Sequence, residues 1–314
     1  MSDLSSSLDI PAHFKRQFAT QWQHVCQQKT RKFASAGILI PDWTTKQYIW
    51  QDLDTVTGVE TTGQRGGDTN VQEMTGGART AMKRTFDIGV IKHKWDQEWL
   101  HKQALPESEV IMAMDATLNR WTDDVFIDAA TTTVYGGADP YVTAITLPAT
   151  SQVAVNWAKP GASAANVGLT PWKILEAKRR IIATDEDMTG KEFFLAISSE
   201  EVLQLTAYSE TYPNETWAKV VGKWIEQSNS GLPAQLMGCT VIHSERLPVN
   251  TSTDIRTCAL FLKEGFHVSG LDHGITVDRL PTKRNSVQFL DQSAFGALRV
   301  KDPFVQVIYC DRSP

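Results

Sequence analysis

Residues 106–130 read PESEVIMAMDATLNRWTDDVFIDAA and hold the clearest helical pattern in the chain. Apolar residues recur there at spacings of four, four, three and four: Val110, Met114, Leu118, Trp121 and Val125. That period places them along one face of a helix. Glu107 and Glu109 add negative charge to the first turn, where it complements the helix dipole. The pattern predicts a long helix over roughly residues 107–130, ended by Thr131-Thr132-Thr133 and Gly136-Gly137.

Upstream of this helix, residues 58–77 have too few apolar side chains to form a core. They contain six of the chain's 20 glycines and no Leu, Ile, Phe, Tyr or Trp. Strand-like residues flank the stretch, with Tyr48-Ile49-Trp50 before it and Phe86, Ile88 and Val90 alternating after it. Unstructured connections of this length are commonly binding loops, lids or linkers. We therefore expect a long two-stranded excursion with a flexible tip that includes residues 63–67 and 76–79.

The first 44 residues open polar and serine-rich. Phe14, Phe18 and Trp22 recur in them at four-residue steps, which predicts one apolar edge of a helix. The segment has little other core of its own, so this edge must be covered by another surface. An arm lying on another surface fits this pattern, and an ordinary N-terminal helix on its own domain is the alternative.

Downstream of residue 165, helix and strand signals are mixed. Thr170-Pro171 predicts a helix start, since Thr is a good N-cap and Pro suits the first helical position. A short strand around Phe193, Leu195 and Ile197 leads into Ser198-Ser199-Glu200-Glu201, which is typical of a capped helix start. Further short strands are expected near residues 237–242, 258–262, 275–277, 286–290, 295–300 and 305–309. The order of elements predicts an α+β fold.

Composition excludes several classes of protein. Lys plus Arg number 31 against 36 Asp plus Glu, and the net charge of −5 disfavours tight, sequence-independent DNA binding. No apolar run is long enough for a membrane span, and the N-terminus lacks a signal-peptide pattern, so we expect a soluble, non-secreted protein. The four cysteines stand singly, which is typical of small buried hydrophobes in a reducing compartment.

No set of residues converges on a catalytic or metal-binding motif. Ser198-Ser199 lacks the Gly-x-Ser-x-Gly pattern of a nucleophile elbow. The glycine-rich stretches lack a Gly-Lys-Ser/Thr ending, and no two histidines stand four apart around a Glu. His243 and His273, with Glu245 and Asp272 nearby, are expected to be satisfied or solvated. We predict no catalytic residue, no cofactor and no metal.

Cations around the glycine-rich stretch favour a protein interface. Arg65, Arg79, Lys83 and Arg84 stand near Asp68 and Glu73 in sequence. Arg is enriched at interfaces because its planar guanidinium group forms directed bonds with carboxylates. A solvated loop is the alternative.

The order of these parts resembles the major capsid proteins of tailed double-stranded-DNA bacteriophages, the Hong Kong 97-type fold. Three stretches carry the resemblance: residues 112–124 (MAMDATLNRWTDD) for the spine helix, residues 231–244 (GLPAQLMGCTVIHS) for a turn into a strand, and residues 295–307 (FGALRVKDPFVQV) for the closing strands. The resemblance implies an N-terminal arm over 1–44, an extended loop over 45–92, a peripheral domain with the spine helix over 93–165 and 266–314, and an axial domain over 166–265.

The resemblance implies a head protein that self-assembles into the icosahedral shell around the DNA genome. Its partners would be further copies in hexamers and pentamers, a portal and a decoration protein, with no membrane and no sequence-specific DNA contact. The chain begins directly with the arm, so a separate scaffolding protein is expected. The protein would lie in the host cytoplasm during assembly and in the virion afterwards. We expect inter-subunit contacts from the arm and the loop: Phe14, Phe18, Trp22, Arg65, Arg79, Lys83 and Arg84.

Two alternatives belong to other classes. An encapsulin-like compartment would share the fold and enclose a cargo enzyme. A soluble enzyme with a flexible lid loop would form a small oligomer with a ligand pocket.

Overall fold

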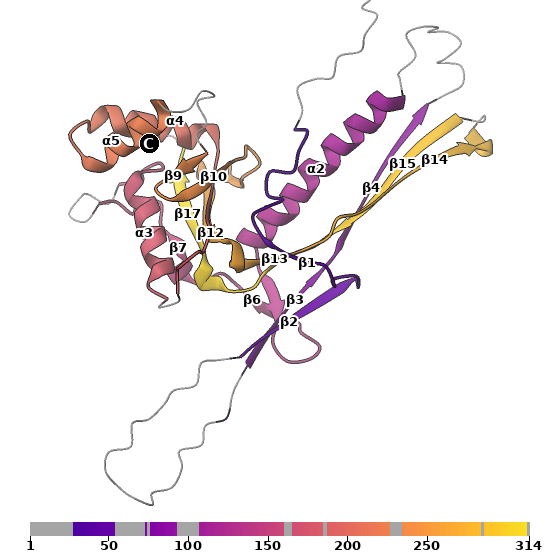
Figure 1. Ribbon diagram of the computed structural model, residues 1–314, viewed down its shortest axis with the longest axis horizontal. Coiled ribbons are helices and arrows are strands. Elements are labelled where there is room, and N and C mark those ends of the chain that lie inside the picture. The colour runs from indigo at the N-terminus through magenta and orange to yellow at the C-terminus, as the bar shows by residue number, and fades with distance from the viewer. Residues whose placement is uncertain are drawn as a thin grey trace, which may run out of the picture. The chain divides into compact units, whose positions relative to one another are not determined.

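Figure 1 shows the protein as a computed structural model, which describes residues 28–53, 73, 76–92, 107–159, 165–184, 187–226, 234–283 and 286–312. The chain divides into two compact units. The first comprises residues 1–29, 86–119 and 273–292, and the second comprises residues 30–85, 120–272 and 293–314. Helix α2 (Glu107–Thr131) and strand β4 (Arg84–Lys92) contribute residues to both units.

A mixed sheet forms the centre of the second unit. Its strands run in the order β7 (Gln152–Val153), β17 (Val305–Asp311), β12 (Ile255–Leu262), β8 (Phe193–Ile197), β10 (Cys239–His243) and β9 (Gln235–Leu236), and β11 (Val249–Asn250) also pairs with β12. Strands β8 and β10 are parallel, whereas β12 is antiparallel to both β8 and β17. All five residues of β8 are buried, as expected for a strand covered on both faces.

Three helices of the second unit begin and end where the sequence supplies suitable residues. They are α3 (Pro171–Ile182), α4 (Ser199–Thr211) and α5 (Thr216–Glu226). Thr170 caps α3, whose first residue is Pro171, as predicted. Ser198 and Glu201 form a capping box at the start of α4. The capping role predicted for this junction is therefore confirmed.

The core of the second unit joins the central sheet to the last turns of α2. Phe126 of α2 lies with its ring centroid 5.6 Å from that of Phe261 on β12 and 4.7 Å from that of Phe266. Helix α3 buries Ile174 and Ile181 in the same cluster. Three cysteines are free and buried, as predicted: Cys239, Cys258 and Cys310. The fourth, Cys26, lies outside the described residues.

Two smaller sheets complete the second unit. One has the order β1 (Ile38–Ile40), β13 (Phe266–Ser269) and β16 (Ala297–Arg299). The other has the order β2 (Gln47–Leu53), β3 (Gly76–Met82), β5 (Val134–Gly136) and β6 (Thr143–Ile145). Short 3₁₀ turns of this unit lie at Ala149–Ser151, Lys263–Gly265 and Asp302–Phe304, and the turn at Pro281–Lys283 belongs to the first unit.

The first unit consists of a sheet and the N-terminal half of α2. Its strands have the order β14 (Asp272–Leu280), β15 (Ser286–Phe295) and β4. Val110 and Met114 of α2 form its buried cluster with Phe289 of β15. Ile88 and Val90 of β4 pack against that cluster, which explains their alternation with more exposed residues.

The long helix predicted over residues 107–130 is confirmed, since α2 runs from Glu107 to Thr131. The flexible tip predicted for residues 76–79 is wrong, because these residues begin strand β3 and pair with β2. None of the helices among the described residues is both long enough and apolar enough to cross a membrane.

A buried lysine ties α3 to two neighbouring segments. Lys173 is fully buried, and its Nζ donates to the carbonyl oxygens of Val155 at 2.9 Å, Val167 at 2.7 Å and Tyr309 at 2.7 Å. Burial lowers the pKa of Lys173. The three carbonyl bonds offset the cost of burying this cation.

Replacement of this lysine tests that description. Lys173→Met removes three hydrogen bonds to the backbone, so we expect the free energy of unfolding to fall by about 1 to 3 kcal/mol. Lys219→Met on α5 is the matched control, because Lys219 is exposed and its loss should change stability by less than about 0.5 kcal/mol. Urea unfolding of both variants provides the measurement, and equal midpoints would contradict a structural role for Lys173.

Candidate assembly hairpin and its anchor

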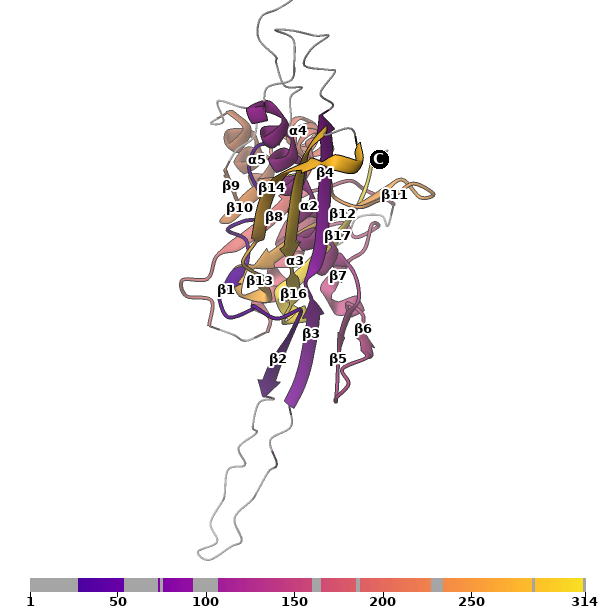
Figure 2. The same cartoon turned by 90° about the vertical axis from the view of Figure 1, so that its right-hand side faces the viewer.

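Strands β2 and β3 form an antiparallel hairpin in the second unit (Figure 2). Their register runs from Gln47 opposite Met82 to Leu53 opposite Gly76. The strand predicted around Tyr48-Ile49-Trp50 is confirmed as β2, but the predicted pairing is wrong, because β2 pairs with β3 and not with the alternating segment around Phe86. That later segment is β4, which belongs to the sheet of β14 and β15. The tip predicted at residues 63–67 lies outside the described residues.

The register assigns each side chain of the hairpin sheet to one of two faces. Residues directly opposite one another in neighbouring strands share a face, and consecutive residues of a strand lie on opposite faces. Trp50, Arg79 and Gly136 are opposite one another and define the inner face. Ile49, Thr80 and Tyr135 define the outer face.

The inner face packs against the body of its own unit. The ring of Tyr48 stacks on that of buried Trp43 with centroids 4.9 Å apart, and its hydroxyl lies 3.2 Å from Nδ1 of His267. Trp50 meets the same imidazole edge-on at 6.2 Å between centroids. Burial lowers the pKa of His267, which favours the neutral imidazole among these aromatic rings. These contacts fix the base of the hairpin on strand β13.

An arginine–aspartate–arginine group anchors the hairpin to the end of the chain. Arg79 on β3 donates from Nη1 and Nη2 to the two carboxylate oxygens of Asp302, at 2.8 and 2.9 Å. Arg299, whose side chain is fully buried, donates from Nε to Oδ1 of Asp302 at 2.8 Å. A carboxylate bound in this bidentate manner holds Arg79 in one orientation. Burial opposes ionisation of Asp302, but the hydrogen bonds and charges of Arg79 and Arg299 outweigh it and lower the pKa of its carboxyl.

The same group also caps the C-terminal end of α2. Arg299 donates from Nη1 to the carbonyl oxygens of Ala130 at 3.1 Å and Thr132 at 2.9 Å. Carbonyls at a helix end lack partners within the helix, and a cation there complements the helix dipole. Asp302 therefore couples the hairpin to the end of the long helix through two guanidinium groups.

The outer face of the hairpin sheet carries large apolar side chains that are exposed to solvent. Ile49 is 40% exposed, Tyr135 54%, Met82 59% and Leu53 67%. These four residues lie on three strands of one sheet and share one face, which also carries Gln47, Gln51 and Thr80. We refer to Ile49, Leu53, Met82 and Tyr135 as the outer apolar face. Exposed apolar surface gathered in this way commonly marks an interaction site.

Three of the basic residues predicted at inter-subunit contacts lie in the part of the chain that the structure describes. All three bind carboxylates of their own chain. Arg79 binds Asp302, Lys83 Nζ lies 2.5 Å from Asp272, and Arg84 Nη1 lies 2.6 Å from Asp128. The side chains of Arg79 and Lys83 are 17% and 7% exposed, whereas that of Arg84 is 53% exposed. Arg84 thus keeps the greatest exposed area for contact with another molecule. The other four predicted contact residues lie outside the described part of the chain: Phe14, Phe18, Trp22 and Arg65.

Sequence reasoning missed Asp302 and Arg299, which hold this anchor together. The local signal is a group of three charged residues, Arg299, Lys301 and Asp302, in a largely apolar C-terminal stretch. His243, expected to be satisfied or solvated, has its Nε2 3.1 Å from Oε1 of its sequence neighbour Glu245. At the α4 junction Ser198 is the helix N-cap, and Ser199 is the first residue of the helix, with its backbone N–H donating to Glu245 at 2.7 Å.

Comparison with known families decides what kind of protein carries this hairpin. The family described as phage capsid protein matches residues 10–312 of the 314-residue chain. The chain belongs to the phage capsid protein family. No curated protein matches the sequence.

Solved structures agree with the fold of this capsid protein. The Cyanophage Pam1 capsid asymmetric unit matches with a TM-score of 0.68 and 12% identity, over 100% of each chain. The capsid of Ralstonia phage GP4 matches with a TM-score of 0.67 and 11% identity, over 99% of this chain and 98% of that chain. The head structure of Helicobacter pylori bacteriophage KHP40 matches with a TM-score of 0.64 and 11% identity, over 99% of each chain.

These findings confirm the fold class and the capsid role. The capsid protein has the Hong Kong 97-like major capsid fold, and it is a shell protein of a bacteriophage virion. The family's role is structural. Neither the encapsulin-like compartment nor the lid-bearing enzyme gains support from the family or from the neighbouring structures.

Proposed function

We propose that this capsid protein self-assembles as hexamers and pentamers into the icosahedral shell that encloses the double-stranded DNA genome of a tailed phage. The outer apolar face carries this proposal. Four large apolar side chains on one sheet stay exposed in the protomer, and a second copy of the chain would remove them from water. Heterologous contacts of this kind repeat around rings and close into a shell.

The anchor of the hairpin suits a contact of this kind. Arg79, Asp302 and Arg299 hold the sheet that carries the outer apolar face, so little conformational freedom is lost when a neighbour binds. Arg84, which is half exposed beside Asp128, would add a charged contact at the edge of the face. Contacts by Phe14, Phe18, Trp22 and Arg65 remain predictions for the arm and the loop.

The four-part domain division remains part of this proposal. It assigns an arm to residues 1–44, an extended loop to 45–92, a peripheral domain to 93–165 and 266–314, and an axial domain to 166–265. Hairpin β2–β3 falls within the extended loop, and helices α3, α4 and α5 fall within the axial domain.

The charge of the capsid protein favours a container wall over a DNA-binding surface. A net charge of −5 gives little attraction for packaged DNA, so the genome would enter and leave without tight binding to the wall. A separate scaffolding protein, a portal and a decoration protein are the proposed partners during assembly in the host cytoplasm.

Negative-stain electron microscopy with light scattering tests the proposed assembly. The full chain would be expressed alone and then with the proteins encoded beside it. Uniform shells under either condition would support the proposal, and co-purifying DNA would distinguish a phage head from a compartment with a protein cargo. Monomers or dimers under both conditions would contradict self-assembly into a shell.

A further inference from the structure

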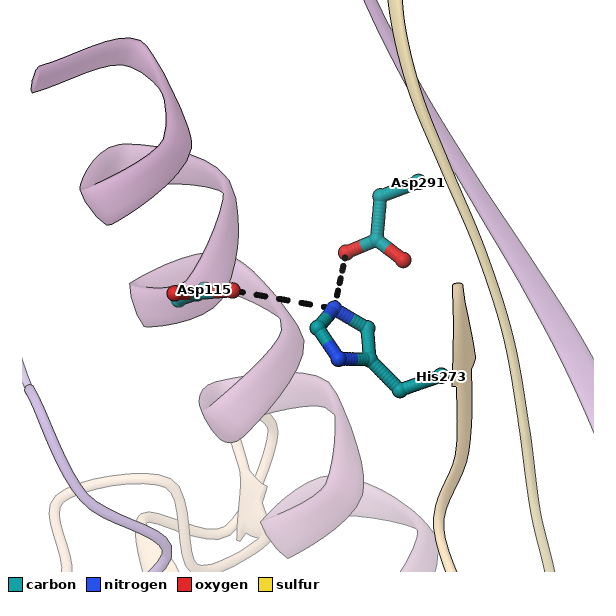
Figure 3. A group of neighbouring side chains, drawn as sticks. All are labelled: Asp115, His273 and Asp291. Atoms are coloured by element: carbon teal, nitrogen blue, oxygen red, sulfur yellow. Dashed lines mark ion pairs between the residues drawn. The ribbon is translucent and has the colours of Figure 1, made fainter. Parts of the chain in front are cut away.

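Three side chains from three elements of the first unit converge on one point (Figure 3). Asp115 lies on α2, His273 lies near the start of β14, and Asp291 lies on β15. Nε2 of His273 is 3.4 Å from Oδ2 of Asp291 and 3.7 Å from Oδ1 of Asp115. One ligand atom from each residue lies within 4.8 Å of the other two.

These distances are long for hydrogen bonds between an imidazolium and carboxylates. A charge-assisted N–H···O⁻ bond measures about 2.7 to 2.9 Å. Both carboxylates also approach the same ring nitrogen, Nε2, which carries at most one proton to donate. A single proton on Nε2 therefore cannot form a short hydrogen bond to both carboxylates.

The same distances fit the coordination shell of a small divalent metal ion. Zinc binds imidazole nitrogen and carboxylate oxygen at about 2.0 to 2.2 Å, and tetrahedral geometry then separates two ligand atoms by about 3.3 to 3.6 Å. The observed separation of 3.4 Å lies within that range, and the separation of 3.7 Å lies 0.1 Å beyond it. An ion between the three groups would be coordinated by Nε2 of His273 and by one oxygen of each carboxylate.

The three residues differ in how far their side chains are exposed to solvent. The side chain of Asp291 is fully buried, whereas those of His273 and Asp115 are 35% and 45% exposed. The exposed side leaves access for the ion and for water in the remaining coordination positions.

We propose that Asp115, His273 and Asp291 bind a divalent transition-metal ion, with Zn²⁺ as the preferred metal. Imidazole together with carboxylates favours zinc and its neighbours, whereas Ca²⁺ and Mg²⁺ prefer shells made of oxygen alone. The ion would join α2 to β14 and β15 inside the first unit. Metal binding would therefore stabilise this unit of the capsid protein.

Zinc titration of the full-length protein tests this site. The protein is treated with EDTA, freed of the chelator and titrated with zinc chloride in a calorimeter. We expect His273→Gln and Asp115→Asn to weaken one equivalent of zinc binding at least about tenfold. His243→Gln is the matched control, because His243 faces one carboxylate, Glu245, and should leave that equivalent unchanged.

Thermal unfolding adds a readout that a purely structural role would not change. Zinc should raise the melting temperature of the wild-type protein and of His243→Gln, but not that of His273→Gln. Equal melting temperatures of all variants in EDTA would show that they fold alike. Zinc affinity in His273→Gln equal to that of wild type would overturn the proposal. Absence of a one-equivalent zinc site in the wild-type protein would do so as well, and would leave the three residues as an ion-pair group.

Discussion

Replacing Asp302 with alanine should lower the free energy of unfolding of the capsid protomer by about 3 to 5 kcal/mol. The loss follows from the two cations that Asp302 binds. Arg299 is fully buried and Arg79 is 17% exposed, so both guanidinium groups would lose their carboxylate in a place with little water. Stability of natural domains is only about 5 to 15 kcal/mol, so such a loss should reduce the yield of folded protein.

Asp128→Ala is the matched control for this variant. Asp128 also binds an arginine, Arg84, at the start of β4. Both side chains of that pair are exposed, at 53% for Arg84 and 41% for Asp128. Exposed pairs contribute at most about 1 kcal/mol. Urea unfolding of the unassembled protomers, followed by tryptophan fluorescence, compares the two. If the two alanine variants unfolded at the same urea concentration, Asp302 would not be the anchor that its hydrogen bonds indicate.

Charges placed on the outer apolar face should abolish shell formation and leave the protomer folded. The double variant Ile49→Asp with Tyr135→Asp would bury two carboxylates against the neighbouring copy without a positive partner. This burial would make the free energy of association less favourable by several kcal/mol for each contact between subunits. Both side chains are part-exposed in the protomer, at 40% and 54%, so we expect its free energy of unfolding to fall by only about 1 to 2 kcal/mol and the protomer to stay folded. Light scattering and electron microscopy measure assembly, while urea unfolding measures protomer stability.

The conservative pair Ile49→Val with Tyr135→Phe controls for the loss of particular side chains. It preserves the apolar character of the face, so shells should form with nearly the wild-type yield. Shells from the doubly charged variant would show that this face is not an inter-subunit contact.

Local patterns in the sequence predicted the long helix and the helix caps. The spacing of Val110, Met114 and Leu118 defines one face of α2, and all three side chains are buried. Thr170 and Ser198 mark helix starts because an N-cap needs only a side chain and the next few backbone amides. These features depend on residues within a few positions of one another, so one sequence suffices to find them.

The strand β3 was missed because its pairing depends on distant residues. Gly76 and Gly77 are typical of a loop, yet they pair with Asp52 and Leu53 of β2, and β3 is held on its other side by β5. Strand preference is weak compared with the effect of neighbouring strands. Glycine content alone therefore gave the wrong structure for this segment.

The anchor and the three-residue cluster were missed for the same physical reason. Arg79 lies more than two hundred positions from its partner Asp302, and charge content gives no indication of which pairs meet. His273 was expected beside Asp272, but the structure brings it near Asp115 and Asp291 from two other elements. Buried polar groups find partners through the fold, and the periodicity of one segment does not reveal them.

Electron cryomicroscopy of assembled particles, at a resolution that shows side chains, tests the central claim most directly. The claim is that this capsid protein builds a shell in which the outer apolar face of each hairpin sheet is covered by a neighbouring copy. We expect density from a second subunit in contact with Ile49, Leu53, Met82 and Tyr135, with the bonds between Arg79, Asp302 and Arg299 preserved within each subunit. A shell in which these four side chains face solvent would contradict the claim.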